Sequence, residues 1–344
     1  MSNITLLSVD LAKDVFQIAG FTNQLKEVFN RKIKRKDLRS FMAQQPACEL
    51  VMEACYSSHY WARCFQEMGH RVRLLPAQHV TPFVRGNKSD HNDTIAIAEA
   101  SRRPNIRHVP IKTIAQQEIQ SLHRMRELCV LRRTSLMNQT RGLLSEYGVV
   151  SPKGHKAFLK LLGLITDPEH DAISQSLKAQ MRFVREEYQQ LSDRITGIQK
   201  ELTSLVAHQP QCQLLSSVPG IGVINATAIY SAIGNGNQFE NAREFAVWLG
   251  LTPKQRSSGN TFTSGGITKR GDRYLRKQLV HGARALLYRC RDRTDRLSLW
   301  ANALIARRGY NKAVVAMAAK LARICWIVLQ KKRNVSIFVN QSDK

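Results

Sequence analysis

The chain has 344 residues and carries 52 lysines and arginines against 26 aspartates and glutamates, a formal net charge of +26. This length suits two or three domains of about 100 to 200 residues, and the charge favours a large polyanionic partner and argues against a small-substrate enzyme. The excess concentrates in residues 254–344, where 21 basic residues accompany four acidic ones. We therefore expect the C-terminal third to provide the main polyanion surface.

Cysteine and histidine usage argues against disulfides and against structural zinc. Seven cysteines are scattered with no CxxC pair, and ten histidines form no HxH or HxxxH pattern, unlike disulfide frameworks or zinc ribbons. The chain does not open on a basic segment followed by an apolar one, and no run approaches the ~18 apolar residues that span a bilayer. We expect a protein of the reducing cytoplasm with no membrane partner.

Residues 1–108 carry the pattern of an α/β domain. Ile4–Asp10 and Val15–Ala19 are short, β-branched, apolar runs separated by a polar break, which predicts a hairpin. A third run, Cys48–Glu53, precedes a helical pattern, and Arg71–Leu75 then predicts another strand. Strand, helix and strand in this spacing form a βαβ unit.

Residues 109–209 are expected to form a helical arm. The stretch from Ile111 to Tyr147 is helix-prone and basic, and a later stretch has an a/d seam with apolar residues alternately four and three apart. The seam consists of Leu177, Met181, Val184, Tyr188, Leu191, Ile195, Ile198, Leu202 and Leu205. Two interpretations stay open: the helix packs on the preceding helix in an antiparallel hairpin, or it forms an intermolecular coiled coil that joins protomers.

Residues 210–344 predict a mainly α-helical domain. Gly250–Gly271 is rich in Ser, Thr and Gly, and we expect a loop with a functional role there. Val218–Gly222, ahead of a helical stretch, has the form of a helix-hairpin-helix turn. Its Gly220 and Gly222 would let backbone N–H groups approach a phosphate, and a tight turn between two core helices is the alternative.

Four acidic residues stand out by their placement. Asp10 and Glu53 end predicted strands, and Asp90 and Asp93 precede or open a helix expected through residues 94–101. Residues three apart share a helix face, and ligands gather at the strand ends of open α/β sheets. Four convergent carboxylates would repel one another without cations, and their oxygens suit Mg²⁺ or Mn²⁺. The alternative is that each acid only caps its strand or helix.

Basic residues form two separated blocks, one on the helix after Ile111 and one after residue 254. The candidate phosphate contacts are Arg124, Arg126, Arg132, Arg133, Lys254, Arg256, Lys269, Arg270, Arg273 and Arg276. Such binding would be steeply salt-sensitive, whereas a solvated helix face is the alternative for the first block. Two blocks offer more surface than one duplex needs, and A-form RNA is recognised by shape and backbone, so we expect a structured RNA partner beside DNA.

The chain resembles the Piv/MooV recombinases, the DEDD transposases of the insertion-sequence one-ten and eleven-eleven group. The resemblance spans residues from about 5 to 330 and rests on the order of its motifs. These are SVDLAKDVF around Asp10, VMEAC around Glu53, KSDHNDTIAIAEA around Asp90 and Asp93, Val218–Gly222, Phe245–Pro253, Ser257–Gly259, and Ile267–Gly271 leading into Leu275 and Arg276.

The resemblance implies a RuvC-like (RNase H-like) N-terminal domain, a helical coiled-coil arm and a C-terminal transposase domain. The four acids would be the metal-binding tetrad, and the family's nucleophilic serine, which forms a covalent phosphoserine link, maps to Ser258, next to Ser257. Some members are directed to donor and target DNA by a structured non-coding bridge RNA. The resemblance further implies a homo-oligomer, dimer or tetramer, in the bacterial cytoplasm at the nucleoid.

Two other functions stay open. A RuvC-like, structure-specific nuclease would use the same carboxylates with metal-activated water and no serine intermediate. In a non-catalytic nucleic-acid-binding protein, the acids would only cap strands and helices, and the basic helices would cover RNA or DNA. A covalent protein–DNA adduct lost in Ser258→Ala separates the recombinase from the nuclease, and divalent-metal titration separates both from the non-catalytic protein.

Overall fold

The computed structural model describes residues 4–87, 89–259 and 261–333, and the chain divides into two compact units, Met1–Thr113 and Ile114–Lys344. The arm and the C-terminal region, expected as separate domains with boundaries near 108 and 209, belong to the same unit. The part of the expected 210–344 domain after residue 333 lies outside the described residues. The two units are described separately below.

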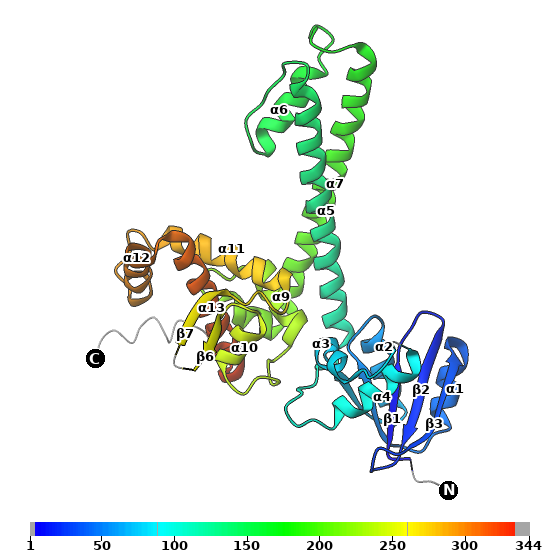
Figure 1. Ribbon diagram of the computed structural model, residues 1–344. Coiled ribbons are helices and arrows are strands. Elements are labelled where there is room, and N and C mark those ends of the chain that lie inside the picture. Colours follow the sequence, from blue (N-terminus) through cyan, green and yellow to red (C-terminus); the bar gives the residue numbers. More distant parts are fainter. Residues whose placement is uncertain (1–3, 88, 260, 334–344) are drawn as a thin grey trace. The chain divides into compact units, whose positions relative to one another are not determined.

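Unit 1 is built on a mixed five-stranded sheet (Figure 1). Its strands are β1 (Leu6–Asp10), β2 (Val15–Phe21), β3 (Glu27–Lys34), β4 (Glu49–Glu53) and β5 (Arg71–Leu75), in the order β3-β2-β1-β4-β5. The first three strands pair antiparallel, whereas β4 runs parallel to both β1 and β5. The opening hairpin and the βαβ unit predicted from sequence are therefore confirmed, and β3 is an addition.

Helices cover both faces of this sheet. They are α1 (Arg35–Ala43), α2 (Ser58–Glu67), α3 (Ala77–Val80), the 3₁₀ turn η1 (Thr81–Phe83) and α4 (Asp90–Ser101). Strand side chains alternate between the faces: Leu7 and Val9 pack with α1 and α2, whereas Leu6 and Val51 pack with α4. The helix expected at 94–101 is confirmed and begins earlier, at Asp90.

Unit 2 begins with two long helices that pack side by side, α5 (Ile114–Ser145) and α7 (Gln175–His208), joined through α6 (His155–Ile165). The heptad seam of α7 lies inside this hairpin: Met181, Tyr188, Ile195, Ile198 and Leu202 are all buried within the single chain. Of the two interpretations of the seam, the structure has the intramolecular one.

The rest of unit 2 surrounds its largest apolar core. The elements are α8 (Pro210–Ser216), α9 (Val223–Ile233), α10 (Ala242–Trp248), β6 (Pro253–Ser258), β7 (Thr261–Ile267), α11 (Arg273–Arg289), α12 (Arg296–Arg308) and α13 (Tyr310–Lys331). Apolar residues of α9, α10, α11 and α13 form this core, as the helical periodicity predicts.

The loop expected over Gly250–Gly271 is wrong, because most of this segment is an exposed antiparallel hairpin of β6 and β7. The last pair of the hairpin joins Ser258 and Thr261. Between these two residues the sequence reads Gly-Asn, a pair typical of two-residue hairpin loops. The abundance of Ser, Thr and Gly obscured this signal.

A second correction concerns the apolar content of α13. By length and composition this helix is apolar enough to cross a bilayer, contrary to the expectation that no run would be, and half of the apolar window is buried within the unit. Its Val314, Met317 and Leu321 belong to the main core, which gives the apolar pattern a packing role.

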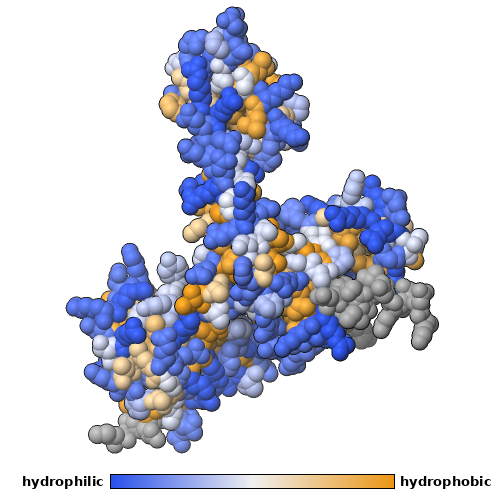
Figure 2. Space-filling view, turned by 180° about the vertical axis from the view of Figure 1, so that it is seen from behind, coloured by the Kyte–Doolittle hydropathy of each residue, from blue (hydrophilic) through white to orange (hydrophobic). Residues whose placement is uncertain are grey.

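Hydrophilic side chains dominate the molecular face shown in Figure 2.

Candidate functional site

Two of the predicted carboxylates lie side by side on the sheet of unit 1. Asp10 ends β1 and Glu53 ends β4, and the parallel register that pairs Val9 with Met52 places them next to each other. Because side chains alternate along a strand, Asp10 faces the same side as Leu6, and Glu53 the same side as Val51. That side is the one covered by α4, so both carboxylates lie at one sheet edge under one helix.

The other two acids lie in the first turn of α4. The hydroxyl of Ser89 accepts a hydrogen bond from the Asn92 backbone N–H at 3.2 Å, so Ser89 caps the helix and Asp90 does not. Helix α4 packs on β1 and β4. The carboxylate of Asp90 lies 3.4 Å from the ammonium of Lys32.

Lys32 belongs to a row of polar residues across this edge of the sheet. The register pairs Asp10 with Gln17, and Gln17 with Lys32, so the row runs from Lys32 through Gln17 and Asp10 to Glu53. We call these four residues the carboxylate row. Sequence reasoning missed Lys32 and Gln17 because the strand β3 was not predicted and Gln17 lies within an apolar run.

Electrostatics supports the proximity of the two carboxylates. Cys55 follows β4, and burial together with the charges of Glu53 and Asp10 raises the pKa of its thiol to about 11. Both carboxylates therefore act on the same thiol, as expected for groups gathered at one edge.

A divalent cation was expected among the four acids, and its fit is mixed. Aspartate and glutamate oxygens are the ligands that Mg²⁺ prefers, and the side-chain oxygen of Gln17 is buried with no hydrogen-bond partner. Among the residues that the structure describes, however, no three His, Cys, Asp or Glu side chains are gathered closely enough to hold a metal ion. The acids share one edge in an open arrangement.

The predicted nucleophile lies on the hairpin of unit 2. Ser258 is the last residue of β6, and alternation places it on the same face as Arg256. Ser257 pairs with Phe262 on the other face, and Phe262 is 72% exposed. Ser258 is thus the serine that shares a face with a guanidinium.

The base of this hairpin is held by close backbone contacts. A Cβ at Gly250 would lie 2.1 Å from the carbonyl oxygen of Arg270, and a Cβ at Gly271 would lie 1.8 Å from that of Trp248. Only glycine, which has no Cβ, lets the backbone at 248–250 approach the backbone at 270–271 this closely, and both glycines have positive φ. The side chain of Arg276 also donates to the Arg270 carbonyl at 3.0 Å.

The basic candidates fall into two groups. Those with exposed side chains are Arg124, Arg132, Lys254, Arg256, Lys269, Arg270 and Arg273. Arg126, Arg133 and Arg276 are partly buried; Arg133 donates to the Ser192 hydroxyl at 3.1 Å and Arg276 to the Leu249 carbonyl at 2.9 Å. The exposed group is the better supported as a phosphate surface.

The glycines of the expected helix-hairpin-helix turn also differ. Gly220 has φ +84° and lies against α11, where a Cβ would meet the carbonyl oxygen of Gly282 at 3.0 Å, so it serves packing. Gly222 is the N-cap residue of α9 and is exposed. The exposed Gly222 is therefore the better placed of the two for a phosphate contact, whereas Gly220 also packs against a backbone neighbour that no sequence signal indicates.

Two models of transposase families match this chain. A family model described as "Transposase IS116/IS110/IS902 family" matches residues 212–298, and a DEDD model described as "Transposase" matches residues 7–149. The second covers all four acids, whereas the first covers the Ser258 hairpin.

Several relatives match nearly the whole chain. A "Probable family 20 transposase" of Pseudomonas aeruginosa is 42% identical over 96% of this chain and 98% of its own. The "Transposase for insertion sequence element IS1111A" of Coxiella burnetii is 40% identical, covering 96% and 91% respectively. The "Transposase for insertion sequence element IS1328" of Yersinia enterocolitica is 35% identical, covering 95% and 97%.

Proposed function

The chain belongs to the IS116/IS110/IS902 transposase family and is a DNA transposase, and we propose that it cuts and rejoins DNA through the carboxylates of unit 1 and Ser258 of unit 2. The observation that carries the proposal is the placement of Asp10 and Glu53 side by side at the ends of adjacent parallel strands, beneath a helix that starts with two more acids. The mixed sheet and its helices support a RuvC-like (RNase H-like) assignment for unit 1.

The four acids are proposed to hold Mg²⁺ or Mn²⁺. When bound, such an ion stabilises negative charge on the oxygens of a phosphodiester undergoing displacement. Asp10 and Glu53 would provide the fixed part of the site because strand pairing positions them. Asp90 is paired with Lys32, so its carboxylate would exchange an ammonium for the metal ion.

Ser258 is proposed to be the nucleophile. Its Oγ forms a bond to phosphorus and the bond from phosphorus to one sugar oxygen breaks. The serine proton is transferred to that oxygen, which leaves as a sugar hydroxyl. Arg256, on the same face of the hairpin, would offset the charge on the phosphate oxygens. The phosphoserine keeps the energy of the broken ester, so a sugar hydroxyl can attack it to rejoin strands without ATP.

The exposed basic residues of both blocks are proposed to bind donor and target DNA and a structured non-coding RNA that guides site choice. The arm is proposed to support assembly into a dimer or tetramer through surfaces other than the buried seam. We place this activity in the cytoplasm, at the nucleoid.

The covalent step is tested by trapping. Wild-type protein incubated with DNA containing an element end, then run on a denaturing gel, should show a protein–DNA adduct. Ser258→Ala should remove the adduct, and Ser257→Ala, the matched control, should keep it. Cleavage without adduct, retained in Ser258→Ala, would favour the alternative of a metal-dependent nuclease that uses activated water.

The guide is tested separately. Nucleic acid copurifying with the protein should include an RNA of discrete length that maps to the flank of the gene. Recombination at full rate after exhaustive RNase treatment would refute RNA guidance and leave direct DNA recognition in its place.

A further inference from the structure

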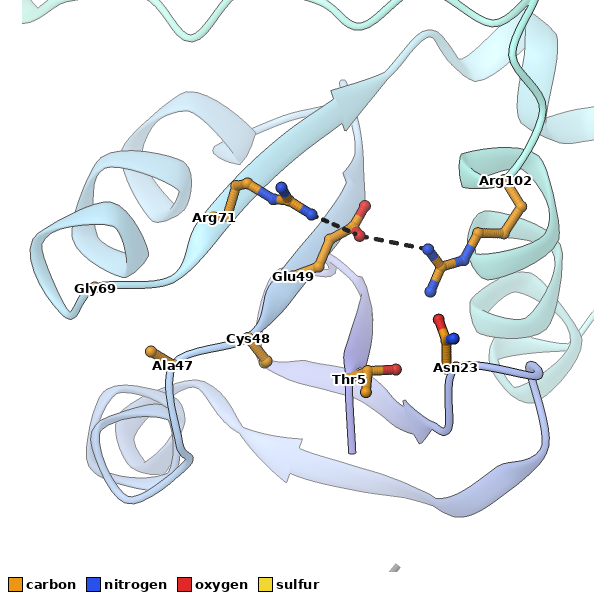
Figure 3. A pocket seen from close by; sticks show the side chains of 8 residues that line it. All are labelled: Thr5, Asn23, Ala47, Cys48, Glu49, Gly69, Arg71 and Arg102. Carbon is orange, nitrogen blue, oxygen red and sulfur yellow. Dashed lines mark hydrogen bonds and ion pairs between the residues drawn. The ribbon is translucent and has the colours of Figure 1, made fainter. Parts of the chain in front are cut away.

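A second charged cluster lies at the opposite end of strand β4 from Glu53. Glu49 begins β4, and its side chain is only 6% exposed. Its Oε2 atom lies 3.3 Å from the guanidinium of Arg71 and 3.5 Å from that of Arg102, and Arg73 contacts the other carboxylate oxygen. Figure 3 shows Arg71 and Arg102 reaching this carboxylate from opposite sides.

The cluster has a surplus of positive charge. Three guanidinium groups surround one carboxylate, and among the described residues no second acid forms an ion pair with them. Burial lowers the pKa of Arg73, and the charge of Arg102 lowers it further because like charges repel. His108, whose ring nitrogen lies 3.2 Å from the Arg73 guanidinium, adds no negative charge, and burial together with the charge of Arg73 lowers its pKa. An anion bound here would relieve this repulsion.

Beside the cluster is a pocket of about 360 Å³. Its lining includes Thr5, Asn23, Glu49, Arg71 and Arg102. The hydroxyl of Thr5 is buried with no hydrogen-bond partner among the described residues. A hydroxyl, an amide and two guanidinium groups are the donors that phosphate oxygens accept from, and a guanidinium binds them in paired fashion.

We propose that this pocket binds a backbone phosphate of nucleic acid, with Glu49 holding the guanidinium groups in place. Arg71 is 79% exposed, so it can engage a phosphate without leaving the protein interior unpaired. Glu49 and Glu53 are separated by four residue steps, about 13 Å at ~3.3 Å each, or roughly four base pairs of duplex. One bound duplex can therefore contact both ends of β4, an inference that rests on the proposed function.

The test is the salt dependence of binding in the full-length protein. The probes are a labelled 30-base-pair DNA duplex and a labelled RNA hairpin of similar length, each titrated by fluorescence anisotropy at several salt concentrations. Arg71→Gln should weaken binding and reduce the slope of log affinity against log salt by about 0.9 for the duplex, since one phosphate contact is lost. The matched control is Arg39→Gln, which removes one exposed charge from α1 of the same unit and should leave the slope unchanged.

Two further variants sharpen the result. Arg71→Lys keeps the charge and should restore most of the slope, whereas Arg71→Gln/Arg102→Gln should reduce it by about 1.8. If the double variant does not unfold cooperatively, the salt slope of Arg71→Gln alone tests the proposal, because an exposed side chain can be replaced without disturbing the fold. Loss confined to the DNA probe or to the RNA probe identifies which nucleic acid supplies the phosphate.

The proposal and the transposase function fail in different ways. Arg71→Gln indistinguishable from Arg39→Gln on both probes would overturn the phosphate pocket and leave the DNA-cleaving function intact. Wild-type protein that binds neither probe would instead overturn the proposed nucleic-acid function itself.

Discussion

The two ends of strand β4 carry the same residue type next to different neighbours. Glu49 and Glu53 lie on one face of one strand, both toward α4. Glu49 is buried among three arginines, whereas Glu53 lies beside Asp10. The difference teaches that removing the glutamate among arginines would leave guanidinium groups without their carboxylate, whereas two neighbouring carboxylates at strand ends provide ligands for a cation.

The sharpest test of this contrast is DNA cleavage. Glu53→Gln should lower the cleavage rate by on the order of 10³-fold or more, because removing charge stabilisation at a displaced phosphate costs several kcal/mol. Binding of DNA should persist. The measurement is single-turnover cleavage on a labelled element end, with the exposed Glu67→Gln on α2 as the matched control. Cleavage at the wild-type rate in Glu53→Gln would exclude the carboxylate row as the active site.

Binding of Mg²⁺ at the Glu53 end of β4 should raise the unfolding temperature of the protein. At a Mg²⁺ concentration 100 times the dissociation constant, a single site stabilises the folded protein by about 2.7 kcal/mol. Thermal unfolding of the wild type should therefore shift upward with Mg²⁺ and return with EDTA. Asp10→Asn should lose the shift, and Glu67→Gln should keep it. A shift that survives in Asp10→Asn would place the ion elsewhere.

Removing the other glutamate should weaken the fold itself. Glu49→Gln leaves three guanidinium groups without their shared carboxylate, and we expect a loss of about 1–3 kcal/mol, at the low end because Arg71 is largely exposed. Urea unfolding of unit 1 measures this loss, and Glu53→Gln should change the same quantity by less. Equal stability of the two variants would contradict the assigned difference between the ends of β4.

The smallest expected effect is on cysteine reactivity. Burial alone raises the pKa of Cys48, beside Glu49, to about 11. Burial, and after it the charges of Glu53 and Asp10, raises the pKa of Cys55 to about 11 as well. In EDTA at pH 8, Asp10→Asn should lower the Cys55 pKa and increase its thiolate fraction. The rate of its alkylation by iodoacetamide should rise a few-fold. A pKa lower by a full unit would raise that rate ~tenfold, and we expect a smaller change. Peptide mass spectrometry should show Cys48 unchanged.

Sequence patterns predicted much of unit 1 because its buried strands are short apolar runs with clear ends. The strand β3 was missed since most of its residues are exposed, including Lys32, and since Arg31 interrupts the face on which Phe29 and Ile33 pack. The positions of Asp10 and Glu53 followed from where their strands end. Their neighbours did not, because the partner of Asp90 lies 58 residues away in sequence, at Lys32.

The arginine cluster illustrates the limit more strongly. Glu49 reads as the polar start of an apolar strand, and its partners come from β5 and from the end of α4. No local pattern links residues so far apart, since only sheet pairing and helix packing bring them together. The Ser258 hairpin is different, because its Gly-Asn signal was present in the sequence and its composition outweighed it.

The length of the arm has a mechanical consequence. His123 fixes α5 to the body of unit 2, because its ring nitrogens lie 2.9 Å from the hydroxyls of Tyr274 and Thr227. From that anchor to the end of α5 at Ser145 the helix extends about 33 Å, at 1.5 Å per residue. The arm is therefore a lever: a rotation of only ~6° at the anchor would move the far end by about 3.4 Å, the rise of one base pair.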